Sequence, residues 1–270
     1  MVERRSALDG EGRGLRVIAV VNQKGGTGKS TTAANLAVAL SAAPLWRKVL
    51  VLDLDRQTNV SMMLGHNTSD APASMSDVFT GRPLRECVLT DVLQPGLSLV
   101  VGDPRLADVE FNLGSARRRE EVLARQLDGQ LDDYDYVLID CPPNQGLLAV
   151  NAVVLAFELV VPVRMTDPNS INGLGDLLAF YDELADAGWP RPISAVLRLD
   201  VDERRDLYRT FDAALANLDV PVSPVQIPSQ AAVAKAAARG RPIAHWRPGS
   251  RAGMAYLHFA EQLHAVAAAA

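Results

Sequence analysis

Residues 20–31 read VVNQKGGTGKST, a glycine-rich stretch whose residue types could hold the phosphates of a nucleotide. The usual P-loop has the pattern G-x-x-x-x-G-K-[ST], in which backbone N–H groups and one lysine bind the phosphates. Here Gln23 replaces the first glycine, and a second lysine, Lys24, lies inside the loop ahead of Lys29. The stretch therefore predicts a phosphate-binding loop of unusual form that carries two cations.

The residues on either side of this loop fit the prediction. An apolar strand is expected to end at Asn22, and an alanine-rich helix is expected to begin at Ser30. Glycines leave room for backbone N–H groups to approach an anion, and a helix N-terminus attracts one. Lys29 is expected to neutralise the β- and γ-phosphates, and the Ser30 hydroxyl is expected to bind Mg²⁺.

Three aspartates follow apolar runs at points where strands are expected to end. Asp53 and Asp55 come at the end of KVLVLDLD, and Asp140 ends YVLID. Side chains alternate along a strand, so Asp53 and Asp55 should share one side, with Leu54 opposite. Mg²⁺ is a hard cation that prefers oxygen ligands. We therefore expect these carboxylates at the sheet edge that carries the P-loop, as the acidic part of a magnesium nucleotide site.

Short runs rich in valine, isoleucine and leucine alternate with segments of helical period along the chain. Strands are expected at LRVIAVVN, KVLVLDLD, LSLVVGD, YVLID, ELVVPV, ISAVLRLD and VSPVQIP. Helices are expected near residues 29–42, 115–130, 146–156, 169–187, 203–218, 229–239 and 250–267. This alternation predicts the α/β class, a doubly wound, mostly parallel sheet with helices on both faces and a ligand beyond the carboxyl ends of its strands.

The composition bounds the organisation of the chain. Residues 1–16 are charged and lack an apolar core, so we expect a flexible N-terminal arm and no signal peptide, followed by a single domain over residues 17–267. No apolar run approaches the roughly 18 to 20 residues of a membrane span. Cys87 and Cys141 lie far apart and suggest neither a disulfide framework nor a metal site. These features favour a soluble cytoplasmic protein.

Four stretches together resemble the ParA-type partition ATPases of the wider ParA and MinD class. They are KGGTGKSTT, VLDLDRQTNVSMMLG, YDYVLIDCPP and IPSQAAVAKAAARGRPIAHWRPGSRAGMAYLHFAEQL. They occur in the family's order and cover the chain from about Val17 to His264, and the early lysine is highly specific for the class. The resemblance implies a single P-loop ATPase domain that forms a homodimer with two ATP molecules between the subunits.

In this class the early lysine reaches across to the partner's phosphates, so Lys24 would serve the other subunit's ATP and Lys29 its own. Two cations in one short loop repel each other unless anionic oxygen is nearby, and a second triphosphate supplies it. Asp55 matches the carboxylate that orients the attacking water, and Pro228 lies where the family's chain packs beside adenine. The implied nucleotide contacts are Lys24, Gly25, Gly26, Thr27, Gly28, Lys29, Ser30, Thr31 and Pro228, and the implied metal residues are Ser30, Asp53 and Asp140.

The chain also departs from the family pattern. Arg56 and Thr58 replace the proline and glycine of DLDPQGN, and Asn144-Gln145 replace the common Ser-Leu after CPP. The stretch PVRMTDPNSINGLGDLL differs from the usual PVQ-E-aromatic pattern. These positions lie around the site and the dimer face, so nucleotide kinetics and partner contacts are where this chain is expected to differ from its relatives.

The distribution of charge points to an anionic partner. The whole chain has a net charge of -5, yet ten basic residues stand against six acidic ones between Arg191 and Arg251. Such a local excess favours sequence-independent contact with the phosphates of double-stranded DNA, the alternative being a solvated charged face. The candidate DNA-binding residues are Arg204, Arg205 and Arg209 near the start of one predicted helix and Lys235 and Arg239 on the next, because helical spacing can gather them.

These observations predict an ATP-dependent DNA segregation ATPase. ATP would close the dimer, the dimer would bind DNA nonspecifically on the nucleoid, and a ParB-like partner would stimulate slow hydrolysis. The end of the chain, HFAEQLHAVAAAA, has no basic face of the kind that anchors MinD-like proteins to membranes. The alternatives are a related ATPase that positions a non-DNA protein cargo and a metabolic P-loop kinase, which would leave Lys24 unexplained.

Overall fold

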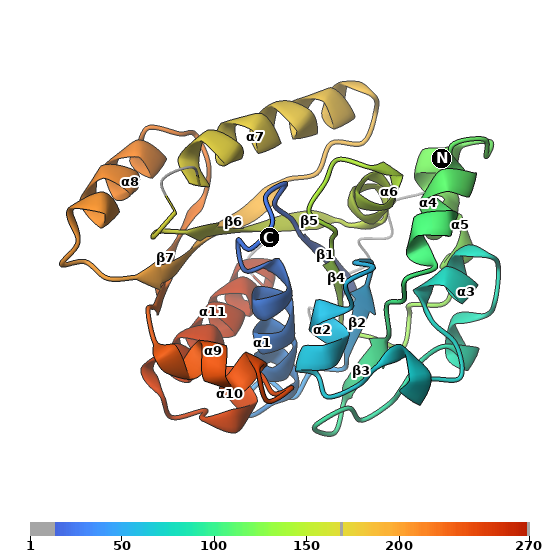
Figure 1. Cartoon of the computed structure of the whole chain (residues 1–270), viewed down its shortest axis with the longest axis horizontal. Helices are drawn as coiled ribbons and strands as arrows, with labels where there is room; N and C mark the ends of the chain where they lie inside the picture. The colour runs from blue at the N-terminus through green and yellow to red at the C-terminus, as the bar shows by residue number, and fades with distance from the viewer. Residues whose placement is uncertain (1–13, 168–169, 269–270) are drawn as a thin grey trace.

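A single parallel sheet organises the molecule, which a computed structural model describes for residues 14–167 and 170–268. Seven strands pair in the order β3-β2-β4-β1-β5-β6-β7, and every pair is parallel (Figure 1). The strands are β1 (Arg16–Val20), β2 (Val49–Asp53), β3 (Leu97–Val100), β4 (Tyr136–Asp140), β5 (Glu158–Arg164), β6 (Ile193–Val201) and β7 (Val222–Pro228). The predicted doubly wound sheet and all seven predicted strands are confirmed.

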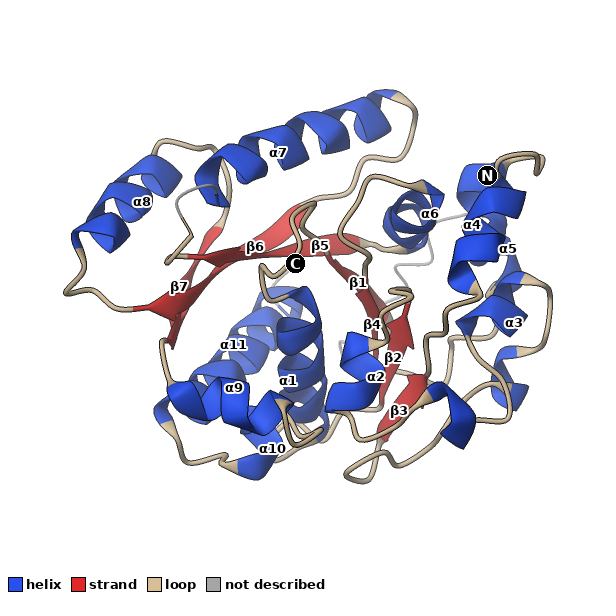
Figure 2. Cartoon of the chain, viewed as in Figure 1, coloured by secondary structure: helices blue, strands red, loops and turns tan. Residues whose placement is uncertain are grey.

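Helices cover both faces of the sheet (Figure 2). The first face carries α1 (Lys29–Ser41), α2 (Asn59–Met63), α9 (Ala231–Ala237), α10 (Ile243–Trp246) and α11 (Arg251–Ala268). The second face carries α3 (Met75–Phe79), α4 (Leu106–Leu113), α5 (Val122–Gln126), α6 (Leu147–Leu155), α7 (Ser170–Asp186) and α8 (Asp206–Ala216). Short 3₁₀ turns are η1 (Thr68–Asp70), η2 (Leu84–Glu86) and η3 (Arg119–Glu121).

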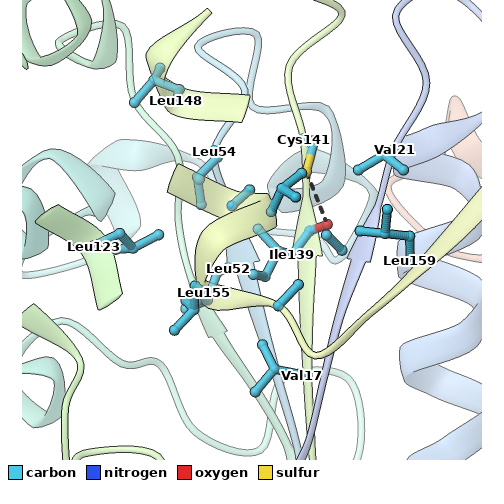
Figure 3. Close-up of a cluster of buried hydrophobic side chains, with 14 of the residues drawn as sticks. Val17, Val21, Leu52, Leu54, Leu123, Ile139, Cys141, Leu148, Leu155 and Leu159 are labelled. Carbon is cyan, nitrogen blue, oxygen red and sulfur yellow. Dashed lines mark hydrogen bonds between the residues drawn. The ribbon is translucent and has the colours of Figure 1, made fainter. Parts of the chain in front are cut away.

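Strand residues alternate between two apolar cores, one on each face. In β1, Val17 and Ala19 belong to the core under α6, whereas Ile18 and Val20 belong to the core under α1. All four side chains are fully buried, as expected for parallel strands covered on both sides. Figure 3 shows part of the α6-side core, in which the thiol of Cys141 donates to the carbonyl of Ile139. Cys141 and Cys87 are free, buried thiols, in line with the absence of a predicted disulfide framework.

One predicted helix is wrong, and several short ones were not predicted. The segment 115–130 is not one helix: it contains η3 and the five-residue α5. The Asn151 side chain of α6 explains the break, because its amide donates to the Arg119 carbonyl and its oxygen accepts from the Leu123 N–H. The helices that were not predicted, α2, α3, α4 and α10, have four to eight residues each, too few to show a helical period.

The predicted N-terminal arm, residues 1–16, lies outside the described residues apart from its last three. Of these, Arg16 already belongs to β1, and its guanidinium donates twice to Glu158 on β5, at 2.6 Å each. The single-domain organisation of residues 17–267 stays a prediction, supported by the single sheet that runs from β1 to β7. Within residues 14–167 and 170–268, no helix is both long and apolar enough to cross a membrane.

A histidine on α11 ties this last helix to the sheet. The Nε2 atom of His264 lies 2.8 Å from Arg47 Nη2, and its Nδ1 atom lies 2.8 Å from the Tyr136 hydroxyl. Arginine can only donate, so Nε2 must accept and the neutral ring carries its proton on Nδ1. Burial lowers the pKa of His264, and the nearby cations Arg47 and Arg16 lower it further, against a weaker opposite effect of Asp135. Protonation at Nε2 would therefore break the contact with Arg47.

We expect this histidine to reduce the stability of the fold in mild acid. An unfolded histidine has a pKa of about 6.5, so below that pH the unfolded chain binds the proton more readily than the folded one, and stability falls. In urea denaturation between pH 7.5 and 5.5, the wild type should lose free energy of unfolding relative to His264→Gln. The control His258→Gln, at an exposed position of the same helix, should follow the wild type. Parallel pH profiles for the wild type and His264→Gln would contradict this role.

Candidate nucleotide-binding site

The predicted P-loop connects β1 to α1 at the carboxyl edge of the sheet. The strand ends at Val20 and the helix begins at Lys29, close to the predicted boundaries. Asn22 shapes the loop: its amide donates to the Pro162 carbonyl at 2.9 Å, and its side-chain oxygen accepts from the Lys24 N–H at 3.0 Å. Gly28 has a φ of 96° and lies against Leu199, so a Cβ atom there would be strained and would clash. The loop thus keeps its backbone open to an anion.

The two lysines of the loop have different surroundings. Lys29 is buried, and its ammonium donates to the Lys24 carbonyl at 3.1 Å. Burial lowers the pKa of Lys29, while the negative charges of Asp140 and Asp55 act in the opposite direction. The Lys24 ammonium instead forms an ion pair with Asp167, in the segment between β5 and α7. One cation is therefore buried beside the carboxylates of the site, and the other pairs with a carboxylate that was not singled out from the sequence.

The sheet brings the predicted carboxylates together. Asp53 ends β2 and Asp140 ends β4, and the two are direct partners in the parallel register, next to β1 and the P-loop. Both are fully buried, and Asp55 is 6% exposed. Asp53 and Asp55 are close, because the Asp55 N–H donates to Asp53 Oδ1 at 3.1 Å. Strand register thus brings Asp53 and Asp140 together at the sheet edge that carries the P-loop, with Asp55 following in the next loop, and the charges of Asp140 and Asp55 act on Lys29.

The oxygens of Asp53 are occupied by donors of the protein. In addition to Asp55, Ser61 on α2 donates to Asp53 Oδ2 through its N–H at 3.1 Å and its hydroxyl at 2.5 Å. Burial raises the pKa of Asp53 to about 7, and these hydrogen bonds act in the opposite direction. Gly102 packs closely against the same carboxylate, since a Cβ atom at this position would come within 2.8 Å of Asp53 Cγ. Asp53 is therefore placed to hold α2 and the Asp55 loop in position.

Asp140 differs from Asp53 in lacking such donors. Within the described residues neither of its oxygens has a hydrogen bond of good geometry, although the nearby Ser30 hydroxyl lowers its pKa. Burial and the negative charge of Asp53 outweigh this effect and raise the pKa of Asp140 well above its ordinary value. Two buried, unpartnered carboxylate oxygens beside a hydroxyl fit the oxygen-rich surroundings that Mg²⁺ prefers.

No group of three or more His, Cys, Asp or Glu side chains within residues 14–167 and 170–268 could hold a metal ion alone. This agrees with Mg²⁺ chemistry, because the ion is usually bound by one or two protein oxygens, water and the phosphates of a nucleotide. Thr31 lies in the first turn of α1, as expected for an α-phosphate contact. Pro228 ends β7, three strands from β1 at the same edge of the sheet.

The candidate DNA-binding residues fall into two separate groups. Arg204 and Arg205, just before α8, both form ion pairs with Asp202, and the exposed Arg209 follows on the helix. Lys235 on α9 and Arg239 just after it are exposed. The two groups lie apart, because α8 and α9 cover opposite faces of the sheet (Figure 1).

A buried P-loop lysine beside carboxylates at strand ends of a doubly wound parallel sheet defines a P-loop nucleotide hydrolase. The profile of the AAA domain family matches residues 15–190, and the chain belongs to this family, as a P-loop ATPase of the ParA and MinD type. The chromosome partitioning protein ParA of Caulobacter vibrioides is 33% identical over 254 residues, which cover 92% of this chain and 94% of that protein. The predicted family resemblance is confirmed.

Solved structures agree with this assignment. Cobyrinic acid a,c-diamide synthase from Mycobacterium smegmatis, with bound ADP and magnesium, has a TM-score of 0.79 and 29% identity, covering 93% of this chain and 94% of that one. The septum site-determining protein MinD from Pyrococcus horikoshii, complexed with Mg-ADP, has a TM-score of 0.76 and 25% identity, covering 94% and 98%. Both neighbours thus combine this fold with a magnesium nucleotide.

The buried charge of Asp140 should cost the protein stability. Asp140→Asn should raise the free energy of unfolding by about 1 to 3 kcal/mol without nucleotide or Mg²⁺, because burial and repulsion from Asp53 outweigh the attraction of Asp140 to Lys29 and the effect of Ser30. Urea denaturation in EDTA measures this effect. The same variant should gain less stability than the wild type from added Mg-ATP. The control Asp128→Asn, at an exposed site, should change stability by less than about 0.5 kcal/mol. A lower free energy of unfolding for Asp140→Asn than for the wild type would contradict this prediction.

Proposed function

We propose that the protein is an ATP-dependent DNA segregation ATPase. In this proposal ATP closes a homodimer, the dimer binds double-stranded DNA without sequence preference, and a ParB-like partner stimulates hydrolysis and release from the nucleoid. The observation that carries the proposal is the difference between the two P-loop lysines: Lys29 is buried in the loop, and Lys24 is partly exposed and paired with Asp167. The similarity to a chromosome partitioning protein over nearly the whole chain supports it.

The cofactors of the reaction are ATP and Mg²⁺. The backbone of the loop and Lys29 bind the phosphates, and Ser30 and Asp140 provide the protein oxygens for the metal. When bound, Mg²⁺ neutralises phosphate charge. Asp53 fixes the Asp55 loop through its hydrogen bonds, so its role is to position its neighbours at the metal site. Thr31 contacts the α-phosphate, and Pro228 packs beside the base.

Asp55 orients the attacking water in this mechanism. Its backbone is fixed by Asp53, and its Oδ1 atom accepts from the Gln57 N–H at 2.9 Å. The other carboxylate oxygen receives no hydrogen bond from the described residues, so it can accept one from a water molecule. Phosphoryl transfer needs little covalent chemistry from the protein beyond position and charge neutralisation. A site in which Asp55 alone orients the water is consistent with slow turnover that a partner accelerates.

Lys24 serves the nucleotide of the other subunit. To reach it, the ammonium must leave Asp167, which replaces the family's usual residues in the stretch PVRMTDPNS. The two side chains of this ion pair are 35% and 26% exposed, so the pair is weak and exchangeable. In the open monomer Asp167 therefore neutralises Lys24, and in the closed dimer the partner's phosphates replace it.

This exchange predicts opposite effects for the two members of the ion pair. Lys24→Ala should bind ATP as a monomer but fail to dimerise, because only the closed dimer uses its charge. Asp167→Asn should dimerise at roughly two- to five-fold lower protein concentration, since it frees Lys24. Light scattering after size exclusion with a nonhydrolysable ATP analogue measures both effects.

The control for the charge change is Asp176→Asn, whose exposed carboxylate lies on the segment that contacts Gln23. It should dimerise as the wild type does. Full dimerisation of Lys24→Ala would refute its action across the interface. Weaker dimerisation of Asp167→Asn would show that Asp167 supports the closed state.

DNA binding should depend on ATP and on salt. One subunit has a modest basic excess, whereas a dimer places two basic surfaces on one duplex and raises their effective concentration. Titration of labelled duplexes should therefore show weak binding with ADP and tight binding with an ATP analogue. Affinity should fall steeply with salt, by about 0.9 logarithmic units per phosphate contact, and should vary little with sequence.

The monomeric Lys24→Ala variant is the control and should bind DNA weakly with either nucleotide. If the wild-type ATP dimer does not bind DNA even at low salt, the proposal is overturned. That result would favour the second candidate function, an ATPase of the same class that positions a protein cargo.

A further inference from the structure

The segment from Val220 to Ala260 contains no aspartate or glutamate, and we call it the acid-free segment. Its lysine and arginine side chains are all exposed, and they are Lys235, Arg239, Arg241, Arg247 and Arg251. No ion pair joins any of the five to a residue within 14–167 or 170–268. By contrast, Arg204 and Arg205 before α8 share Asp202. The positive charge of the acid-free segment is therefore not offset locally.

One aromatic ring holds two of these cations. The guanidinium carbon of Arg239 lies 5.0 Å from the ring centroid of Trp246, and that of Arg247 lies 4.5 Å from the same centroid. The face of an indole attracts a cation, which offsets the cost of bringing two like charges close together. Arg239 also donates to the Lys235 carbonyl at 3.1 Å, which fixes the orientation of its side chain. Trp246 thus keeps a pair of guanidinium groups ordered at an exposed surface.

The region around α9 and α10 packs against α1 and α2, two helices that begin near the nucleotide site. The turn after α9 packs against α2, since a Cβ atom on Gly240 would lie 2.9 Å from the Met62 carbonyl oxygen. The Ala244 N–H of α10 donates to the Asn35 side chain of α1 at 2.9 Å. α1 begins at the P-loop, and α2 is tied to Asp53 through Ser61. The cations are therefore mounted on a rigid support.

We propose that the five cations of the acid-free segment form a surface that binds the phosphate backbone of duplex DNA, with Trp246 as the positioning residue for Arg239 and Arg247. We call this the Trp246 surface. Guanidinium groups bind phosphate oxygens through paired N–H donors, and ordering them in advance lowers the entropy cost of binding. The segment has few aromatic side chains on which bases could stack, which favours contact with the DNA backbone. The inference rests on the proposed function and assigns its DNA contacts to particular residues.

The first test separates the effect of side-chain orientation by Trp246 from the effect of the number of positive charges. In titrations of the ATP-analogue dimer with two unrelated duplexes, Trp246→Leu should bind roughly two- to ten-fold more weakly with an unchanged salt slope, because all charges remain. Trp246→Tyr should restore binding, since a phenol ring also attracts cations. Arg239→Gln and Arg247→Gln should each weaken binding and reduce the salt slope by about 0.9.

Matched controls come from the same chain. Trp46→Leu removes an exposed tryptophan elsewhere, and Arg85→Gln removes an exposed arginine next to Glu86. Both should bind DNA as the wild type does. Dimerisation by light scattering and urea denaturation should show that each variant is folded and dimeric.

A second pair of variants tests the support of the surface. Gly240 and Gly129 have similar left-handed φ values of 61° and 67°, but only Gly240 would meet another backbone through an added Cβ. Both Gly240→Ala and Gly129→Ala should lose stability from backbone strain, and Gly240→Ala should lose more because its Cβ would also clash with the Met62 carbonyl oxygen. Only Gly240→Ala should also weaken DNA binding by the dimer, because it moves the turn that carries Arg239 and Arg241.

The outcomes distinguish this inference from the proposed function. If the wild-type dimer binds DNA but the Trp246, Arg239 and Arg247 variants bind equally well, the Trp246 surface is refuted and the function stands. If the wild-type dimer binds no DNA, the function itself fails. Binding to phosphatidylglycerol vesicles, with none to DNA or phosphatidylcholine vesicles, would assign the surface to an anionic membrane and overturn the inference.

Discussion

Charge buried at one edge of the sheet is the constraint on which the rest of the structure depends. Asp53, Asp55, Asp140 and Lys29 are all at least 94% buried and lie at the ends of neighbouring strands or in the adjoining loop. Carboxylates held together out of water repel each other, and burial alone disfavours their charged form. The fold offsets this cost unevenly. Donors from Ser61 and the Asp55 backbone satisfy Asp53, whereas Asp140 keeps its oxygens unpartnered.

Much of the fold could be predicted because its strands are buried on both faces. Such strands read as continuous apolar runs, and the aspartates at their ends mark the carboxyl edge of the sheet. The P-loop, α1 and all seven strands follow from these local patterns. The prediction of one helix over residues 115–130 is wrong because Asn151, a residue of another helix, forms hydrogen bonds with backbone groups that a continuous helix would pair internally. No pattern within the segment shows that contact.

The site could be predicted only in part, again because sequence patterns are local. The motif residues are recognisable by their spacing, but the residues that form hydrogen bonds or ion pairs with them are not. Asp167 meets Lys24 across 143 positions of sequence, and no local pattern indicates the contact. Ser61 had a weaker signal, since it lies only eight positions after Asp53 at the start of a helix too short to recognise. Spacing along the sequence also does not show that Arg204, Arg205 and Arg209 lie on the other side of the sheet from Lys235 and Arg239. This follows only from the placement of α8 and α9 on opposite faces.

The energies of the contacts at the P-loop suit a switch better than a permanent structure. An ion pair as exposed as Lys24–Asp167 is worth about 0 to 1 kcal/mol, so its loss hardly affects the stability of a monomer. A triphosphate offers several anionic oxygens in a closed, water-poor interface, where each contact with an ammonium is stronger. In the proposed mechanism, Lys24 would therefore exchange partners at a net gain only when a second subunit brings its nucleotide. The same loop would then respond both to ATP, through Lys29, and to a partner subunit, through Lys24.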